Sequence, residues 1–196
     1  MPETVAIIGA GPLGRRLALA AARAGVPSDR SSSLGWSAGF RVLLEDVMPA
    51  NLHHAQEFLR QQLGPDALPN IAFVSTIDDA VREADLAIDC VPDELESKLE
   101  ILWLLDRMAP PRTVLATPTT RLSIADLANC TCRPDKCVAI AAEASALAAS
   151  PARELDGAPQ EILLRTTAKT APETVALLDR FWRRLGFAPL FEPEQP

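Results

Sequence analysis

Short apolar runs alternate with mixed or amphipathic segments along the whole chain. Runs with the length and apolar content of buried β-strands occupy residues 4–8, 40–45, 71–74, 86–91, 113–116, 137–142, 162–166 and 188–191. The intervening segments with helical periodicity occupy residues 13–24, 50–63, 77–82, 94–108, 122–128 and 172–185. Strands that alternate with helices predict an α/β fold built on a doubly wound, mostly parallel sheet.

Length and composition indicate one globular domain. The chain has 196 residues, of which 48% are hydrophobic and 23% charged, as in ordinary single-domain proteins. We therefore expect a single domain over residues 1–196. Two segments depart from the pattern: residues 25–39, rich in Gly and Ser, predict a flexible inserted loop, and residues 192–196 predict a frayed tail.

The charge balance excludes some partners. The net charge is -7, whereas a protein that binds a phosphate backbone needs a basic face. No apolar run approaches the ~18 residues of a membrane span, and the first residues lack the basic region of a signal peptide. We expect a cytoplasmic protein with neither nucleic-acid nor membrane partners.

The first predicted strand leads directly into a glycine motif. Residues 9–14 read Gly-Ala-Gly-Pro-Leu-Gly, which is GxGxxG between a strand and a helix. In such a motif Gly9 permits the tight turn, Gly11 lets a diphosphate approach the backbone, and Gly14 lets helix and strand pack closely. The helix N-terminus then faces the anion. The motif predicts a Rossmann-type dinucleotide site; the alternative is a tight turn without a ligand.

The second predicted strand ends in two acidic residues, Glu45 and Asp46. An acid at this point binds the adenosine ribose and favours NAD over NADP by repelling a 2′-phosphate. Glu45 follows Gly14 by more than the usual ~20 residues, and the loop at 25–39 accounts for the excess. We assign the ribose to Glu45; the alternative for either acid is a solvated strand end.

Three segments resemble the NAD-binding domain of 3-hydroxyacyl-CoA dehydrogenases. They read VAIIGAGPLGRRLALAAARAG, STIDDAVREADLAIDCVPDELESK and APPRTVLATPTTRLSIADLANCTCRPDK, and the likeness spans most of residues 4–140, with a weaker echo in 161–191. The resemblance implies a sheet of order 3-2-1-4-5-6 with additional edge strands, and NAD bound across the strand ends. It also implies an oxidoreductase of fatty acid metabolism that acts on a hydroxyacid or an acyl-CoA.

The resemblance assigns roles beyond the glycines. Asp93 matches a Glu near the cofactor, and Lys98 matches a Lys that reaches toward the nicotinamide. Thr120 matches a Ser, so its hydroxyl is the predicted catalytic group, the alternative being a loop or capping hydroxyl. The residues that we expect to bind the cofactor are Gly9, Ala10, Gly11, Pro12, Leu13, Gly14, Glu45, Asp46, Val91, Pro92, Asp93, Lys98 and Thr117.

The catalytic residues of that family do not carry over. Ala141 stands in place of its general acid/base His and Ala144 in place of its Asn; Leu163 falls at its partner Glu, with Glu161 two residues away. An alanine cannot accept the hydroxyl proton. A second hypothesis is therefore a catalytically degenerate NAD-binding module, or a subunit completed by a partner chain.

Two further points follow from the same comparison. In an active enzyme Lys98 or Glu143 would have to replace the missing His. The family also has an all-helical C-terminal domain that forms its dimer, and this chain stops at Pro196 before such a domain would begin. A homodimer that covers the face left open is an expected assembly.

Other conspicuous side chains leave alternatives open. Cys130, Cys132 and Cys137 form CxCx4C, which is a metal or disulfide pattern or a set of small buried residues; without a fourth ligand we expect no metal. Trp36 folds over a ligand or a partner chain or else packs its loop onto the core. The terminal helix with Trp182 is either an oligomer interface or packs on its own sheet. The adjacent pair His53 and His54 reads as surface helix residues.

Overall fold

The structure is a computed structural model and describes residues 3–24, 40–63, 68–142 and 159–194. The predictions for the loop at 25–39, for Trp36, and for Glu143 and Ala144 lie outside these ranges. Within them, no helix has the length and apolar content that a membrane crossing requires.

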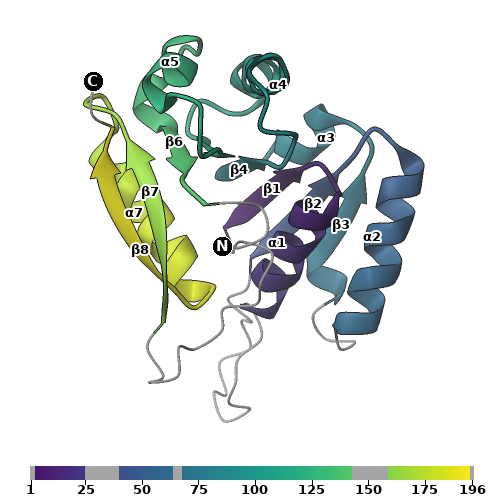
Figure 1. Ribbon diagram of the computed structural model, residues 1–196. Helices are drawn as coiled ribbons and strands as arrows, with labels where there is room; N and C mark the ends of the chain where they lie inside the picture. Colours follow the sequence, from purple (N-terminus) through teal and green to yellow (C-terminus); the bar gives the residue numbers. More distant parts are fainter. Residues whose placement is uncertain (1–2, 25–39, 64–67, 143–158, 195–196) are drawn as a thin grey trace.

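The described elements form one eight-stranded sheet in the order β3-β2-β1-β4-β5-β6-β7-β8 (Figure 1). All neighbouring strands are parallel except β6 and β7. This confirms the predicted Rossmann-type, mostly parallel sheet with additional edge strands. The strands are β1 Thr4–Ile8, β2 Arg41–Glu45, β3 Ile71–Val74, β4 Leu86–Asp89, β5 Val114–Pro118, β6 Cys137–Ile140, β7 Gln160–Thr166 and β8 Phe187–Pro193.

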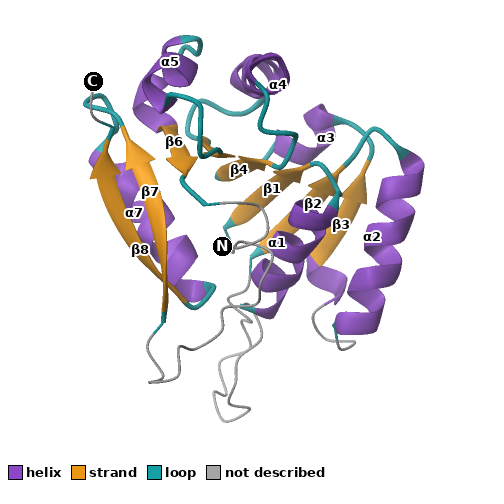
Figure 2. Cartoon of the chain, in the orientation of Figure 1, coloured by secondary structure: helices purple, strands orange, loops and turns teal. Residues whose placement is uncertain are grey.

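Helices cover both faces of the sheet (Figure 2). One face packs against α1, α2 and α7 and the other against α3, α4 and α5, so two apolar cores lie on either side of the strands. All five side chains of β1 are buried because both faces of this central strand are covered. The helices are α1 Pro12–Arg23, α2 Pro49–Gln62, α3 Ile77–Val81, α4 Leu95–Met108, α5 Ile124–Asn129 and α7 Pro172–Arg184.

Trp182 belongs to the core. Its side chain is fully buried on α7, with its ring 5.1 Å from that of Phe181 and 5.5 Å from that of Phe187, both edge-on. Such edge-to-face contacts are favoured between aromatic rings. The alternative of a partner interface at Trp182 is therefore wrong.

The predicted tail is wrong for residues 192–194. β8 continues to Pro193 beside β7, and the Glu194 carboxylate accepts hydrogen bonds from the backbone N–H groups of Ile124 and Ala125 and from the Ser123 hydroxyl. These bonds lower the pKa of Glu194 against the opposing effect of partial burial. A carboxylate in this position satisfies the first N–H groups of α5.

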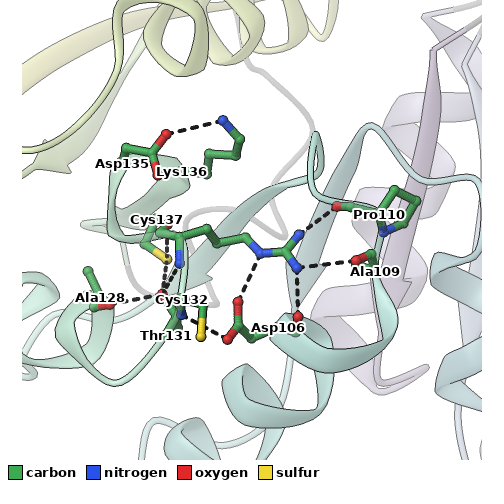
Figure 3. A network of polar contacts seen from close by, with 10 residues as sticks. Asp106, Ala109, Pro110, Ala128, Thr131, Cys132, Asp135, Lys136 and Cys137 are labelled. Carbon is green, nitrogen blue, oxygen red and sulfur yellow. Dashed lines mark hydrogen bonds and ion pairs between the residues drawn. The ribbon is translucent and has the colours of Figure 1, made fainter.

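The cysteine-rich segment is held by an arginine network (Figure 3). Arg133 donates from Nε to the Asp106 carboxylate at 2.9 Å, and from Nη2 to the Asp106 carbonyl at 2.6 Å. Cys132 donates its N–H to the same carboxylate. Cys137 is buried, which raises its pKa to about 11, whereas Cys130 and Cys132 are exposed. The expectation of small buried residues thus holds for Cys137 alone.

Candidate dinucleotide site

The loops that follow β1, β2, β4, β5 and β6 converge on a cavity of about 720 Å³. This is the carboxyl edge of the parallel strands, where open α/β sheets bind their ligands. The residues that line it are Gly9, Gly11, Pro12, Leu13, Asp46, Asn51, Cys90, Val91, Pro92, Asp93, Pro118, Thr119, Thr120 and Ala142. Its volume is that of a site for a medium-sized organic ligand.

The three glycines of the motif have three different environments. Gly9 has φ +100°, which disfavours any residue with a side chain. A Cβ at Gly14 would overlap the carbonyl oxygen of Gly9, so the start of α1 can approach the turn only without one. A Cβ at Gly11 would meet nothing within 4 Å, and Gly11 lines the cavity. The open space above Gly11 is the place where a ligand can touch backbone.

The N-terminus of α1, which is the positive end of the helix dipole, faces this space. Gly11 is the N-cap and provides no side-chain cap, Pro12 occupies the first turn, and the first turn contains no acidic residue. An uncapped helix N-terminus with an open approach suits an anionic group. The glycine turn therefore fits the diphosphate of a dinucleotide.

Asp46, not Glu45, faces the cavity. Asp46 Oδ2 accepts hydrogen bonds from the Ala10 N–H at 2.9 Å and from Asn51 Nδ2 at 3.0 Å, and Asp46 Oδ1 accepts one from the Met48 N–H at 2.8 Å. Glu45 is 5% exposed and is not among the lining residues. Burial, and secondarily the charge of Asp46, raises the pKa of Glu45 to about 7.

The loop after β4 contributes three of the predicted residues. Val91, Pro92 and Asp93 all line the cavity. Asp93 Oδ2 accepts a hydrogen bond from the Thr120 N–H at 3.2 Å, so the loops after β4 and β5 are joined at the cavity wall. The predicted catalytic residue, Thr120, is thus placed beside an acidic side chain.

Lys98 and Thr117 belong to the protein interior rather than to the cavity wall. Lys98 Nζ lies 2.6 Å from Asp89 Oδ1, and neither side chain is exposed. Burial raises the pKa of Asp89, while Lys98 and Thr117 oppose that shift. A lysine sequestered in this way is not positioned to replace the missing His.

Sequence reasoning missed several lining residues. Asn51 contacts Asp46 from the first turn of α2, and Thr119 accepts the N–H of Leu122. Cys90, Pro118 and Ala142 each lie at or just beyond the end of a strand. Their position in the sequence directly after a predicted strand would have identified them, because the residues that follow parallel strands lie at this edge of the sheet. His53 and Glu57 form an exposed pair on α2, away from the lining residues.

A second cavity of about 300 Å³ adjoins the first, and Ala142 lines both. Its wall includes Ala141 and Leu163, and the Ala141 N–H donates to the Leu163 carbonyl at 2.9 Å. The two positions that the resemblance assigns to an acid/base pair are therefore adjacent, and both carry hydrocarbon side chains. Glu161 also lines this cavity.

Comparison with known proteins gives one family. The model of the 3-hydroxyacyl-CoA dehydrogenase NAD-binding domain matches residues 4–141. The protein named "Probable 3-hydroxybutyryl-CoA dehydrogenase" from Bacillus subtilis is 28% identical over 149 residues, covering 69% of this chain and 47% of its own length. L-carnitine dehydrogenase from Burkholderia mallei is 28% identical over 190 residues, covering 96% of this chain and 54% of its own length.

Solved structures agree on the fold. The crystal structure of (S)-3-hydroxybutyryl-CoA dehydrogenase from Ralstonia eutropha superposes with a TM-score of 0.78 at 22% identity, covering 100% of this chain and 65% of its own. The present chain spans about half the length of the curated relatives that it matches.

Proposed function

The chain belongs to the family of the 3-hydroxyacyl-CoA dehydrogenase NAD-binding domain, with NAD as its cofactor, and from this premise we propose that it is a dehydrogenase acting on a small hydroxy compound beside the 720 Å³ cavity. The observation that carries the proposal is the open space above Gly11 at the uncapped N-terminus of α1. The identity of the substrate and the reaction itself belong to the proposal.

Each end of the cavity has residues suited to one part of the dinucleotide. The backbone of Gly9 and Gly11 and the N-terminus of α1 would hold the diphosphate. The Asp46 carboxylate, already held by the Ala10 N–H and by Asn51, would accept the ribose hydroxyls and repel a 2′-phosphate. In this role Asp46 takes the place of Glu45, whose side chain is buried.

The reaction proposed is oxidation of a carbinol to a carbonyl. When bound, NAD supplies the carbon that accepts the hydride. The hydroxyl proton needs a base, and we assign it to Asp93, a lining residue whose Oδ1 is buried and accepts no hydrogen bond from the described residues. The Thr120 hydroxyl, next to Asp93 at the cavity wall, would orient the substrate oxygen.

A second candidate function is a catalytically silent NAD-binding module. It is favoured by one observation: Ala141 and Leu163 line the second cavity with hydrocarbon. Such a module would keep the glycine turn and Asp46 but show no turnover, because neither side chain at the position of the expected acid/base pair can exchange a proton.

Two measurements on the purified chain separate these functions. Fluorescence titration with NADH tests the cofactor site, and absorbance at 340 nm tests NADH formation from NAD with 3-hydroxybutyrate, 3-hydroxybutyryl-CoA and hydroxylated amines. Saturable NADH binding with turnover of any member supports the dehydrogenase. Binding without turnover supports the silent module, and the absence of NADH binding overturns both.

A further inference from the structure

Two side chains from the end of the chain hold the loop that carries Thr120. We propose that Arg165 on β7 and Glu194, directly after β8, are positioning residues, which fix the loop at residues 119–123 so that Thr120 stays at the wall of the cofactor cavity. This inference rests on the proposed function, because it concerns the same site and takes Thr120 as the group that orients the substrate oxygen.

The loop begins where β5 ends and leads into α5. Thr119 and Thr120 line the cofactor cavity of about 720 Å³, and two strands, β1 and β4, separate β5 from β2. Neighbouring strands lie about 4.8 Å apart, so this end of the cavity is about 14 Å from the end that carries Asp46. The proposed function therefore places the reacting half of NAD, and the substrate, beside this loop.

Arg165 holds the start of the loop. Its Nη2 donates a hydrogen bond to the Thr119 carbonyl at 3.0 Å, and the Thr119 N–H donates to the Ile140 carbonyl at 3.1 Å. Both backbone polar groups of Thr119 are therefore held, one by the neighbouring strand β6 and one by a side chain. Of these two contacts, the one made by the Arg165 side chain can be removed by substitution.

Glu194 holds the end of the same loop. Its Oε2 accepts hydrogen bonds from the Ser123 hydroxyl and the Ala125 N–H, each at 2.9 Å, and its Oε1 accepts one from the Ile124 N–H at 3.1 Å. The helix α5 also has an N-cap of its own, because the Ser123 hydroxyl accepts the Asp126 N–H. Glu194 therefore adds a connection between the end of β8 and the point where the loop enters α5.

The two side chains act mainly on the loop and only weakly on each other. Arg165 Nη1 lies 3.9 Å from Glu194 Oε1, which is too long for a hydrogen bond, and a partly exposed ion pair of this kind contributes little to stability. Glu194 is itself fixed, because its N–H donates to the Thr166 carbonyl at 2.8 Å. The main effect of the two side chains is therefore to select one conformation of the loop.

Between its two ends the loop contacts the proposed base. The Thr120 N–H donates to Asp93 Oδ2 at 3.2 Å, and Arg121 Nη2 donates to the Asp93 carbonyl at 2.8 Å. A shift of the loop would therefore move the Thr120 hydroxyl and disturb the Asp93 carboxylate together. Binding of the adenosine diphosphate half of the cofactor, which the proposed function assigns to the glycine turn and Asp46, should not depend on the loop.

The test compares NADH with ADP-ribose, which has a hydroxyl in place of the nicotinamide ring, by isothermal titration calorimetry. Arg165→Gln and Glu194→Gln should each weaken NADH binding about 2- to 30-fold, the range for residues that act on a site without touching its ligand, and leave ADP-ribose binding unchanged. The two variants change the net charge in opposite directions, so a loss shared by both does not come from long-range electrostatics. Equal losses for the two ligands, or no loss for NADH, overturns the proposal.

Arg180→Gln is the matched control, because Arg180 on α7 forms an exposed ion pair with Glu3 and should change neither affinity. The double variant of Arg165→Gln and Glu194→Gln should lose less NADH affinity than the product of the single losses, since both residues act on one loop. A full product overturns the joint role.

Arg165→Gln leaves the N-terminus of α5 intact, so it decides the test alone where Glu194→Gln fails to fold. An unmodified chain that binds neither NADH nor ADP-ribose overturns the proposed function. An unmodified chain and variants that all bind NADH equally well overturn only the positioning role, so the failure of one is distinguishable from the failure of the other.

Discussion

Lys98 Nζ on α4 lies 2.6 Å from Asp89 Oδ1 at the end of β4, and both side chains are fully buried. This ion pair closes the connection whose residues, Cys90 to Asp93, line the cofactor cavity. The loop is thus fixed at its base by a contact that itself never reaches the ligand. Two opposite charges can be buried without a large loss of stability only when they pair with each other.

Replacing Lys98 by Met should therefore destabilise the protein strongly. The substitution leaves the Asp89 carboxylate buried without its cation, a change that typically costs about 3–5 kcal/mol. Urea unfolding monitored by circular dichroism measures it. Lys169→Met is the control, because Lys169 makes an exposed hydrogen bond to Asn129 and should change stability by less than about 1 kcal/mol. Equal stability of the two variants would contradict the structural role of the pair.

Substitutions at two glycines of the turn should affect folding and cofactor binding separately. Gly11→Ala should fold normally, because a Cβ there meets no atom within 4 Å, yet it should weaken NADH binding by about tenfold or more, since about 1.4 kcal/mol of lost contact has that effect. Gly14→Ala should fail to fold, because its Cβ would overlap the Gly9 carbonyl. Thermal unfolding and NADH fluorescence titration measure the two properties. A Gly11→Ala chain that binds NADH at full affinity would place the diphosphate elsewhere.

Much of this arrangement could be predicted from the sequence. The alternation of apolar runs and helical segments gives the strands and helices, and the GxGxxG motif places the turn. The apolar runs predict strands over 86–91 and 137–142, whereas β4 ends at Asp89 and β6 at Ile140. Beyond those residues the chain leaves the sheet and lines the cavities. The residue types alone do not reveal where each strand ends.

Side-chain direction was harder to predict. The resemblance predicts Lys98 at the cofactor, but Lys98 shares the buried stripe of α4 with Leu102 and Leu105, at the i, i+4 and i+7 positions that face a core. Glu45 is buried at the end of β2, and the residue that lines the cavity is the next one, Asp46. For Lys98 and for Glu45 the difference depends on the direction in which one side chain points. A single charged residue within an apolar pattern gives only weak evidence of that direction.

Asp46 and Glu45 should differ in their effect on nucleotide binding. Asp46→Asn removes the charge that faces the cavity, so NADH should bind about tenfold more weakly and the preference for NADH over NADPH should shrink. Glu45→Gln should leave both affinities unchanged, because Glu45 does not line the cavity. Parallel fluorescence titrations with the two nucleotides measure this. The opposite pattern would show that Glu45, and not Asp46, binds the ribose.

Glu45 should also make stability depend on pH. Its pKa is raised from 4.5 to about 7 in the folded protein, so the native state holds a proton that the unfolded chain releases above about pH 4.5. The free energy of unfolding should consequently fall as pH rises from about 4.5 to 7, by up to about 3 kcal/mol. Glu45→Gln should show a flatter profile than the unmodified chain in urea titrations without nucleotide. Superimposable profiles would contradict the shift.

The hydrocarbon lining at Ala141 gives a gain-of-function test. Ala141→His places an imidazole at the edge of the second cavity, where it can accept the hydroxyl proton, so kcat for NADH formation should rise by about 100-fold or more. The new activity should depend on a group that titrates near pH 6.5. Absorbance at 340 nm with 3-hydroxybutyrate measures both effects.

The control for this gain is Ala141→Leu, which fills the same space without a base and should leave kcat at or below its starting value. An Ala141→His chain that binds NADH normally but gains nothing would show that the proton acceptor is not what limits turnover. That result would be expected if Asp93 already serves as the base, whereas a gain would show that the unmodified chain is limited by its proton acceptor.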